Sequence, residues 1–533
     1  MRSLARRWSL ARGWMAGLLA GGALGLGWLG PDPAGFSPLG ATVVAAQDPG
    51  EPEGEDTRPC AAYHLPTGHW AARQAARFDR AGLLERDHAT GFRSPEVGDV
   101  VRAFDAAGAS LEMGGAFQQR LAVEMRGLRS PCQDRDREAF QVEWLEVRAG
   151  GEGLRQGLGM GEGSHRQYDG PVERPEAAHP ASEVQAAVTV MPRVAVAARA
   201  RAEGSHLRAH ELYGTARLGS VDVWAGRRAP GYGSGVGGSL VLSGGVPLDG
   251  GGLRLNRGPT LPWIFEYLGP VRFETEVARM NDQGSVERPW FWAYRLSLAP
   301  TDWLRIAANR GTFLGGEGSP SITLGRLGWI LLGSRPNTVE EGYRPGDASS
   351  QVAAAEVEVR GSVRRVPVAG YLEWGFSDNS GMWMRQPGIL TGVELPALGA
   401  SASSLGVEVV DFHTANSILE HGVWYRHHHF QGGWADRGRP LGHPLGGTGR
   451  EILVHGTRGF AGEAVRADLG LFHRDRHETN AFAPPMEGTS HGFRLRADGG
   501  GHRFGASVDL EVEHGGADDR TRAEWAATVR WFF

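Results

Sequence analysis

The chain has 533 residues, enough for several domains or for one large β-barrel. Hydrophobic residues make up only 41% of it, which excludes a protein built from membrane-spanning helices, and its 81 glycines follow no collagen period. The formal net charge of −5 becomes −8 without residues 1–46, which carry four arginines and one aspartate, and an acidic chain argues against nucleic acid as a partner.

Residues 1–46 are predicted to be an export signal. Four arginines precede an apolar, glycine-rich segment from Trp14 to Leu29, and the small residues Val44-Ala45-Ala46 then supply a cleavage site before Gln47. Residues 47–58 are acidic and rich in proline and glycine, so they are predicted to be a disordered linker.

Residues 59–137 have the period of helices. One helix is predicted over His69–Ala81 and a third over about 111–128, and between them Val97, Val100, Val101 and Phe104 form one apolar stripe. Cys60 and Cys132 bracket this segment, and in an oxidising compartment they are expected to form a disulfide, although two incidental thiols fit the spacing as well.

Part of this helical segment resembles a single S-layer-homology repeat. The likeness rests on His69-Trp70-Ala71, Gly82-Leu83 and Phe92-Arg93-Ser94-Pro95. The resemblance implies contact with cell-wall polymers, with peptidoglycan as a further partner. Only one copy is visible and its second helix departs from the usual signature, so a helical plug or cap for a barrel is an equal alternative.

Residues 138–533 alternate between apolar and polar residues, which is typical of strands with two different faces. Apolar residues run from Phe504 through Val508 to Val512, and Asp509 and Glu511 lie between them on the other face. A water-lined lumen with lipid outside explains such charges, although a soluble sandwich could place them on its surface. At roughly 20 or more residues per strand, the segment predicts an antiparallel barrel with an even number of strands in the high teens.

The last strand ends in an aromatic face made by Trp525, Val529, Trp531 and Phe533. It resembles the closing strand of bacterial outer-membrane barrels, whose final aromatic residue is read by the barrel-assembly machinery. The resemblance implies an all-β transmembrane protein of the outer membrane, in contact with outer-membrane lipid.

Three phrases in the barrel region resemble the Wzi family of outer-membrane capsule-assembly proteins. They are WAGRRAPGYGSGVGGSLVLSGG from Trp224, AYRLSLAPTDWLRIAANRGTFLGGEG from Ala293, and VWYRHHHFQGGWADRGRPLGHPLGG from Val423. The first departs from the family pattern at Arg228-Ala229. The resemblance implies an eighteen-stranded barrel with a helical periplasmic element that binds capsular or extracellular polysaccharide as a lectin and assists capsule assembly or attachment.

No motif requires an enzyme, a metal or another cofactor. At most two of the histidines 427–429 share one face of a strand, and the glycine-rich stretch 231–245 has no lysine and opens no helix, so it is not a phosphate loop. Glycan recognition needs aromatic faces for sugar rings and planar donors for carboxylates. The candidates with this chemistry in or beside predicted loops are Trp383, Arg385, Tyr425, His429, Trp434, Arg437, Arg439 and His443.

For any single one of these residues an aromatic belt or a lumenal salt bridge is the favoured interpretation, and only the set as a whole is the candidate for glycan binding. The alternative function is a porin-like channel for small solutes or sugars. A loop or helix folded into the lumen would favour the lectin, and a clear pore would favour the channel.

Overall fold

The computed structural model describes the chain from residue 64 to residue 532, with gaps. The described residues are 64–65, 70–84, 99–100, 141–155, 181–191, 193–203, 206–255, 258–331, 349–377, 387–398, 403–412, 424–436, 439–460, 465–477, 480, 487–500, 504–517 and 519–532. The predicted signal peptide, the linker, Cys60, Cys132, the third predicted helix and Phe533 lie outside them.

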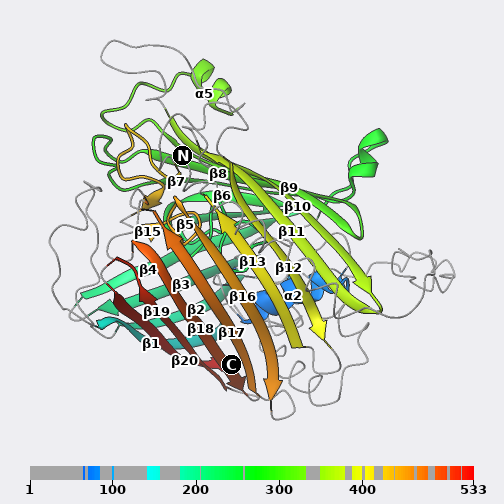
Figure 1. The fold of residues 1–533 in the computed structure, drawn as a ribbon. Helices are drawn as coiled ribbons and strands as arrows, with labels where there is room; N and C mark the ends of the chain where they lie inside the picture. The colour runs from blue at the N-terminus through cyan, green and yellow to red at the C-terminus, as the bar shows by residue number, and fades with distance from the viewer. Residues whose placement is uncertain are drawn as a thin grey trace, which may run out of the picture. The chain divides into compact units, whose positions relative to one another are not determined.

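Eighteen antiparallel strands form one sheet, and Figure 1 shows them in order around the molecule. Every consecutive pair is hydrogen bonded, β13 pairs with β16, and β1 pairs with β20, so each strand has two neighbours. The predicted barrel of about 18 strands is confirmed. The strands are β1 (Gln141–Arg155), β2 (Ala181–Met191), β3 (Val194–Glu203), β4 (His206–Leu218), β5 (Val221–Arg228), β6 (Leu248–Leu255), β7 (Val271–Arg279), β8 (Trp290–Thr301), β9 (Leu304–Leu314), β10 (Ser349–Val363), β11 (Val366–Ser377), β12 (Gly388–Leu398), β13 (Ser403–Asp411), β16 (Gly449–Phe460), β17 (Val465–Arg476), β18 (Gly488–Gly500), β19 (Phe504–Gly515) and β20 (Arg520–Phe532).

The remaining elements lie outside this sheet. They are the helices α2 (Trp70–Arg80) and α5 (Leu324–Leu331), the 3-10 helix η1 (Trp263–Leu268), and a small hairpin of β14 (Ala435–Asp436) with β15 (Arg439–Pro440). The helix predicted over His69–Ala81 is thus confirmed within a residue at each end. Of the predicted second helix the structure describes Asp99 and Val100, which are helical.

The two faces of the strands have the predicted orientation. In β19, Val508 is 54% exposed on the outside, whereas Ser507 and Glu513 are buried on the inside. Trp525, Val529 and Trp531 of β20 are exposed in the same way. Alternate residues point to opposite faces, so the apolar set covers the outside of the wall, as it does in lipid-facing barrels.

Many of the charges inside the wall are paired. Arg474 binds Glu451 at 2.5 Å and Glu513 at 2.7 Å, and Arg295 binds Glu356 at 2.8 and 2.9 Å. These arginines and glutamates are almost fully buried. Because a buried charge without a partner is costly, the pairs account for the many polar residues on the inner face.

The two ends of the barrel differ in their connections. Two-residue turns join β4 to β5, β8 to β9 and β10 to β11 at one end, which we call the turn end. The longest connections, residues 315–348 and 412–448, lie at the other, which we call the loop end. In outer-membrane barrels short turns face the periplasm and long loops face the outside.

Candidate functional site

The connection between β5 and β6 folds into the barrel, and we call residues 229–247 the lumen loop. Nearly all of its residues are buried, including Tyr232 and Leu240. The backbone N–H of Tyr232 donates to the carbonyl of Leu242 at 2.7 Å, so the loop doubles back on itself.

Carboxylates from distant strands hold the lumen loop through its backbone. Glu408 of β13 accepts from the N–H groups of Val236 at 2.6 Å and Gly237 at 2.8 Å. Glu373 of β11 accepts from the N–H of Leu240 at 2.9 Å. These bonds satisfy backbone groups that would otherwise be buried without partners, so the loop is fixed to the wall.

The glycines of the lumen loop are required by this close approach. Gly233 has φ 104°, and a Cβ there would collide with the Glu373 carboxylate. A Cβ on Gly237 would lie 2.8 Å from Glu408 Oε1. The glycine-rich stretch 231–245 therefore lets backbone reach carboxylates on the wall.

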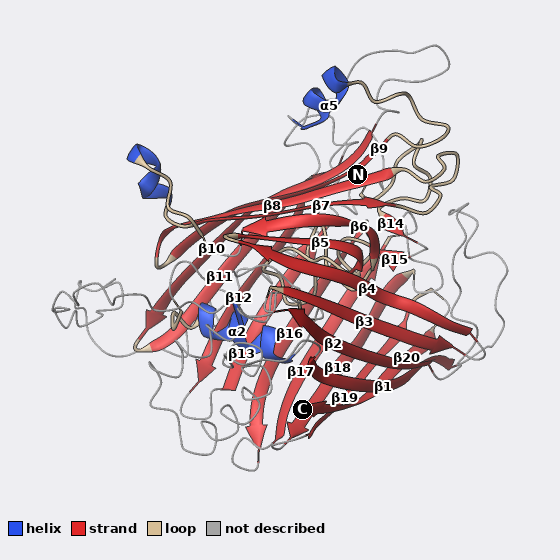
Figure 2. Cartoon of the chain, turned by 180° about the vertical axis from the view of Figure 1, so that it is seen from behind, coloured by secondary structure: helices blue, strands red, loops and turns tan. Residues whose placement is uncertain are grey.

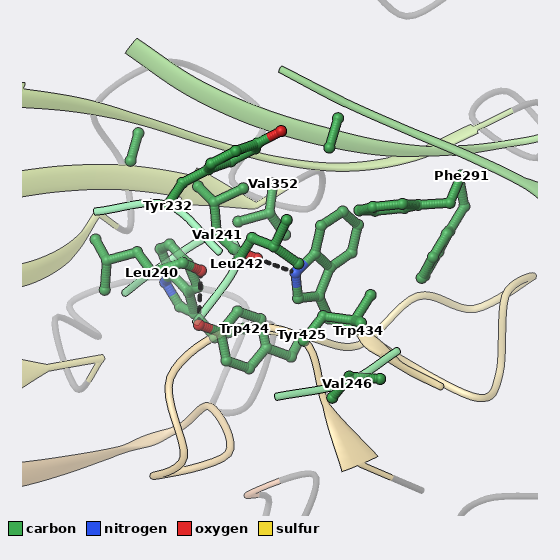
Figure 3. Close-up of a cluster of buried hydrophobic side chains, with 14 of the residues drawn as sticks. Tyr232, Leu240, Val241, Leu242, Val246, Phe291, Val352, Trp424, Tyr425 and Trp434 are labelled. Carbon is green, nitrogen blue, oxygen red and sulfur yellow. Dashed lines mark hydrogen bonds between the residues drawn. The ribbon is translucent and has the colours of Figure 1, made fainter. Parts of the chain in front are cut away.

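A second loop lies over the lumen loop at the loop end; we call its described residues, 424–436 and 439–448, the lid loop. The indole N–H of Trp434 donates to the carbonyl of Val241 at 2.8 Å, and the hydroxyl of Tyr425 donates to the carbonyl of Leu240 at 2.7 Å (Figure 3). The Trp434 ring packs 4.8 Å from that of Phe313, centroid to centroid. The two loops thus share one apolar core (Figure 3).

Helix α2 occupies the lumen near the turn end; both views show it within the ring of strands (Figures 1 and 2). Asp79 is fully buried and binds Arg305 of β9 at 2.6 Å and Arg360 of β10 at 2.7 Å. Arg80 binds Glu394 of β12 at 2.5 Å and donates to the carbonyl of Ser234 in the lumen loop. The helix and the lumen loop are therefore linked to each other as well as to the wall.

The segment before α2 is also held inside. His64 is buried, and its backbone exchanges hydrogen bonds with the hydroxyl of Tyr213 on β4. Its ring lies edge-on to Trp224 of β5, 5.5 Å between centroids. Burial, followed by the positive charge of Arg228, lowers the pKa of His64 well below its usual value, so the imidazole is neutral at pH 7.

The predicted glycan-binding residues fall into three groups. Tyr425, Trp434 and His443 lie in the lid loop but are 2%, 1% and 0% exposed, so they hold the loop rather than present a free ring. His429 is half-buried, and its carbonyl accepts from the hydroxyl of Ser285 at 3.0 Å. Trp383, Arg385 and Arg437 lie outside the described residues, and Arg439 is described only as part of the backbone of β15.

The structure also presents polar residues at the loop end that the sequence analysis missed. The lid loop pairs with the connection between β7 and β8 through a bridge between Gly284 and Phe430. The exposed polar side chains on these two neighbouring segments are Asp282, Ser285, Glu287, Arg288, His428 and Gln431. They form a hydrophilic rim, and no pattern in the sequence marks them, because they come together only through the contact between the loops.

Within the described residues, no helix is long and apolar enough to cross a bilayer, and no group of three or more His, Cys, Asp or Glu side chains could hold a metal ion.

Comparisons with known proteins bear on the barrel. The model of the family described as capsule assembly protein Wzi matches residues 155–517. A search of curated protein sequences found no match.

Among solved structures, the chain is similar to Wzi, described as an outer-membrane protein involved in group 1 capsule assembly in Escherichia coli and as a carbohydrate-binding β-barrel. The two share 17% identity with a TM-score of 0.63, over 89% of this chain and 100% of that one. Two Pseudomonas aeruginosa proteins are more distant. OccD3 (OpdP) has 10% identity and a TM-score of 0.41 over 74% of this chain and 92% of its own, and OprD has 9% and 0.41 over 74% and 94%.

Proposed function

The chain belongs to the Wzi family of capsule assembly proteins, and from that premise we propose that it is a non-enzymatic lectin of the outer membrane. Its ligand would be capsular or extracellular polysaccharide, bound at the loop end, and its role would be to assist the assembly or attachment of that polymer. The Escherichia coli Wzi structure that it resembles is described as a carbohydrate-binding β-barrel.

The filling of the lumen is the observation that carries the proposal. The lumen loop extends from the loop end, α2 lies near the turn end, and the two meet where Arg80 donates to the carbonyl of Ser234. Both are fixed by buried charged groups, such as Glu408 under the loop and Asp79 in the helix. A porin-like channel needs a water-filled path, so this arrangement favours the lectin over the channel.

The loop end supplies suitable chemistry for sugars. The hydrophilic rim carries Arg288, His428 and Gln431, and His429 lies beside it. Trp383, Arg385, Arg437 and Arg439 belong to neighbouring connections and remain proposed contacts. Repeating sugars would be held by several weak contacts at once, so avidity would replace one tight site.

Contacts with other partners are also proposals. Outer-membrane lipid would surround the wall, and the barrel-assembly machinery would read Trp525, Val529, Trp531 and Phe533. A peptidoglycan contact through the S-layer-homology-like segment is the weakest of these, because Ala71, Asp79 and Arg80 of α2 are buried inside the barrel.

The proposal is tested by measuring binding and conductance on the same purified protein. Arg437→Ala and Arg385→Ala should each weaken binding to an acidic capsular polysaccharide, and the control Arg364→Ala, in the turn between β10 and β11, should not. The wild type should show little conductance in a planar bilayer. Steady open-channel conductance without polysaccharide binding would establish the channel instead.

A further inference from the structure

The connection between β6 and β7 differs from the other connections at the turn end. It contains η1, in which no residue is buried, and Trp263, Ile264 and Tyr267 are 85%, 73% and 74% exposed. In both views the short helix stands clear of the ends of the strands (Figures 1 and 2). A cluster of large apolar side chains that are this exposed marks a contact surface.

The base of this connection is fixed. The N–H of Val271 donates to the carbonyl of Pro259 at 3.1 Å, and Thr260 forms a bridge with Pro270. Gly269 follows η1 with φ 67°, where a Cβ would collide with the carbonyl of Ala299 on β8. Both ends of the connection are therefore held at the wall, whereas no residue of η1 itself is buried.

The first residue of η1 adopts an uncommon backbone conformation. Trp263 has φ 64°, which bulky residues rarely adopt and which costs about 1–3 kcal/mol. In the described part of the chain, none of the η1 side chains is buried in a contact that would offset this strain. A contact outside the chain would offset it.

The position of η1 identifies that contact. The outer face of the wall nearby is apolar, with Leu253 of β6 and Leu296 of β8 exposed, and Trp303 is exposed in the turn that follows β8. The helix lies in the connection that joins β6 to β7, at the turn end of this apolar face. Tryptophan and tyrosine favour the boundary between lipid and water, where their rings are buried and their polar atoms remain hydrated.

We propose that η1 is an interfacial anchor, inserting Trp263, Ile264 and Tyr267 among the phospholipid headgroups of the leaflet at the turn end. Glu266, the single charge in the helix, would remain in water. A protein partner fits less well, because stable interfaces bury roughly 1,200–2,000 Å² in total and a six-residue 3-10 helix offers far less.

Photocrosslinking tests the anchor on the full chain. A benzophenone amino acid replaces Ile264 in one protein and, as the control, Gln431 in another, since Gln431 is exposed in the lid loop at the opposite end. Each is folded into phospholipid vesicles, irradiated and analysed by mass spectrometry, after heat-dependent gel mobility has verified its folding.

The label at position 264 should form phospholipid adducts in several-fold higher yield than the label at position 431. Equal lipid yields at the two positions would overturn the proposal. So would an adduct at position 264 that joins two copies of the chain, or, after irradiation in cells, one that joins it mainly to another protein. Because lipid contact at η1 does not depend on polysaccharide, failure here would leave the proposed lectin function untouched.

Discussion

Asp79 provides a direct test of how α2 is held in the lumen. It is fully buried and binds both Arg305 and Arg360, at 2.6 and 2.7 Å. Asp79→Asn keeps the size of the side chain but removes the charge, leaving two buried guanidinium groups with less compensation. Breaking a buried pair in this way costs about 3–5 kcal/mol. The equilibrium between docked and released helix should shift toward release by roughly two to four orders of magnitude.

Amide hydrogen exchange of Trp70–Arg80 measures this shift, because the helix can leave the lumen while the sheet stays intact. The matched control is Asp411→Asn, which breaks the pair with Arg450 at 2.7 Å, where the arginine is 53% exposed. An exposed pair contributes about 0–1 kcal/mol, so exchange in the control should hardly change.

A double variant makes the test sharper. Asp79→Asn with Arg360→Gln removes one of the two uncompensated charges, so part of the protection should return. If exchange of the helix in Asp79→Asn equals that of the wild type, the buried ion pairs do not hold α2, and the reasoning is refuted.

Three further predictions concern the wall, the N-terminal segment and the lid loop. Val508→Arg places a charge on the lipid-facing side of β19 and should lower the free energy of unfolding by about 2–4 kcal/mol if the residue lies near the bilayer midplane, whereas Asp509→Asn should lower it much less. Denaturant titration in vesicles measures both variants. Equal losses would contradict the assigned faces. The pKa of His64 is lowered in the docked segment, so the undocked segment binds a proton that the docked one does not. Docking should therefore weaken as the pH falls below about 6.5, the usual pKa of histidine. His64→Phe should remove this pH dependence, as measured by amide hydrogen exchange of the segment. Trp434→Ala should cost about 3–5 kcal/mol of lid-loop stability, because it removes a buried ring and the bond to Val241, and limited proteolysis that finds the lid loop equally resistant would count against it.

The wall and the first helix could be predicted from sequence because their signals are local. Alternation along β19 already separates Val508 from Asp509, and the end of α2 follows from Gly82, because glycine commonly ends a helix. Both patterns involve neighbours in the chain, which is why they remain readable without the fold.

The interior arrangement could not be predicted, because its contacts join distant segments. Glu408 binds the backbone of Val236 across 172 positions, and no sequence pattern assigns that acid to that loop. The sequence predicts Tyr425 and Trp434 as glycan contacts because aromatic residues in a loop suit sugars, but in the structure both are buried in the core between two loops. The glycines at 233 and 237 were the available signal, since backbone without side chains permits such close approach.

The contacts of α2 also determine the order in which the protein can assemble. The helix precedes every strand in the chain, yet Arg73 binds Asp468 of β17 at 2.6 Å, and the ring of strands closes only when β20 pairs with β1. Its docking site therefore does not exist until most of the barrel has been synthesised. Such long-range pairing is slow to form, so the polar N-terminal segment must remain undocked through most of folding. The complete docking site of the helix is therefore formed only late in folding, when β17 has joined the wall.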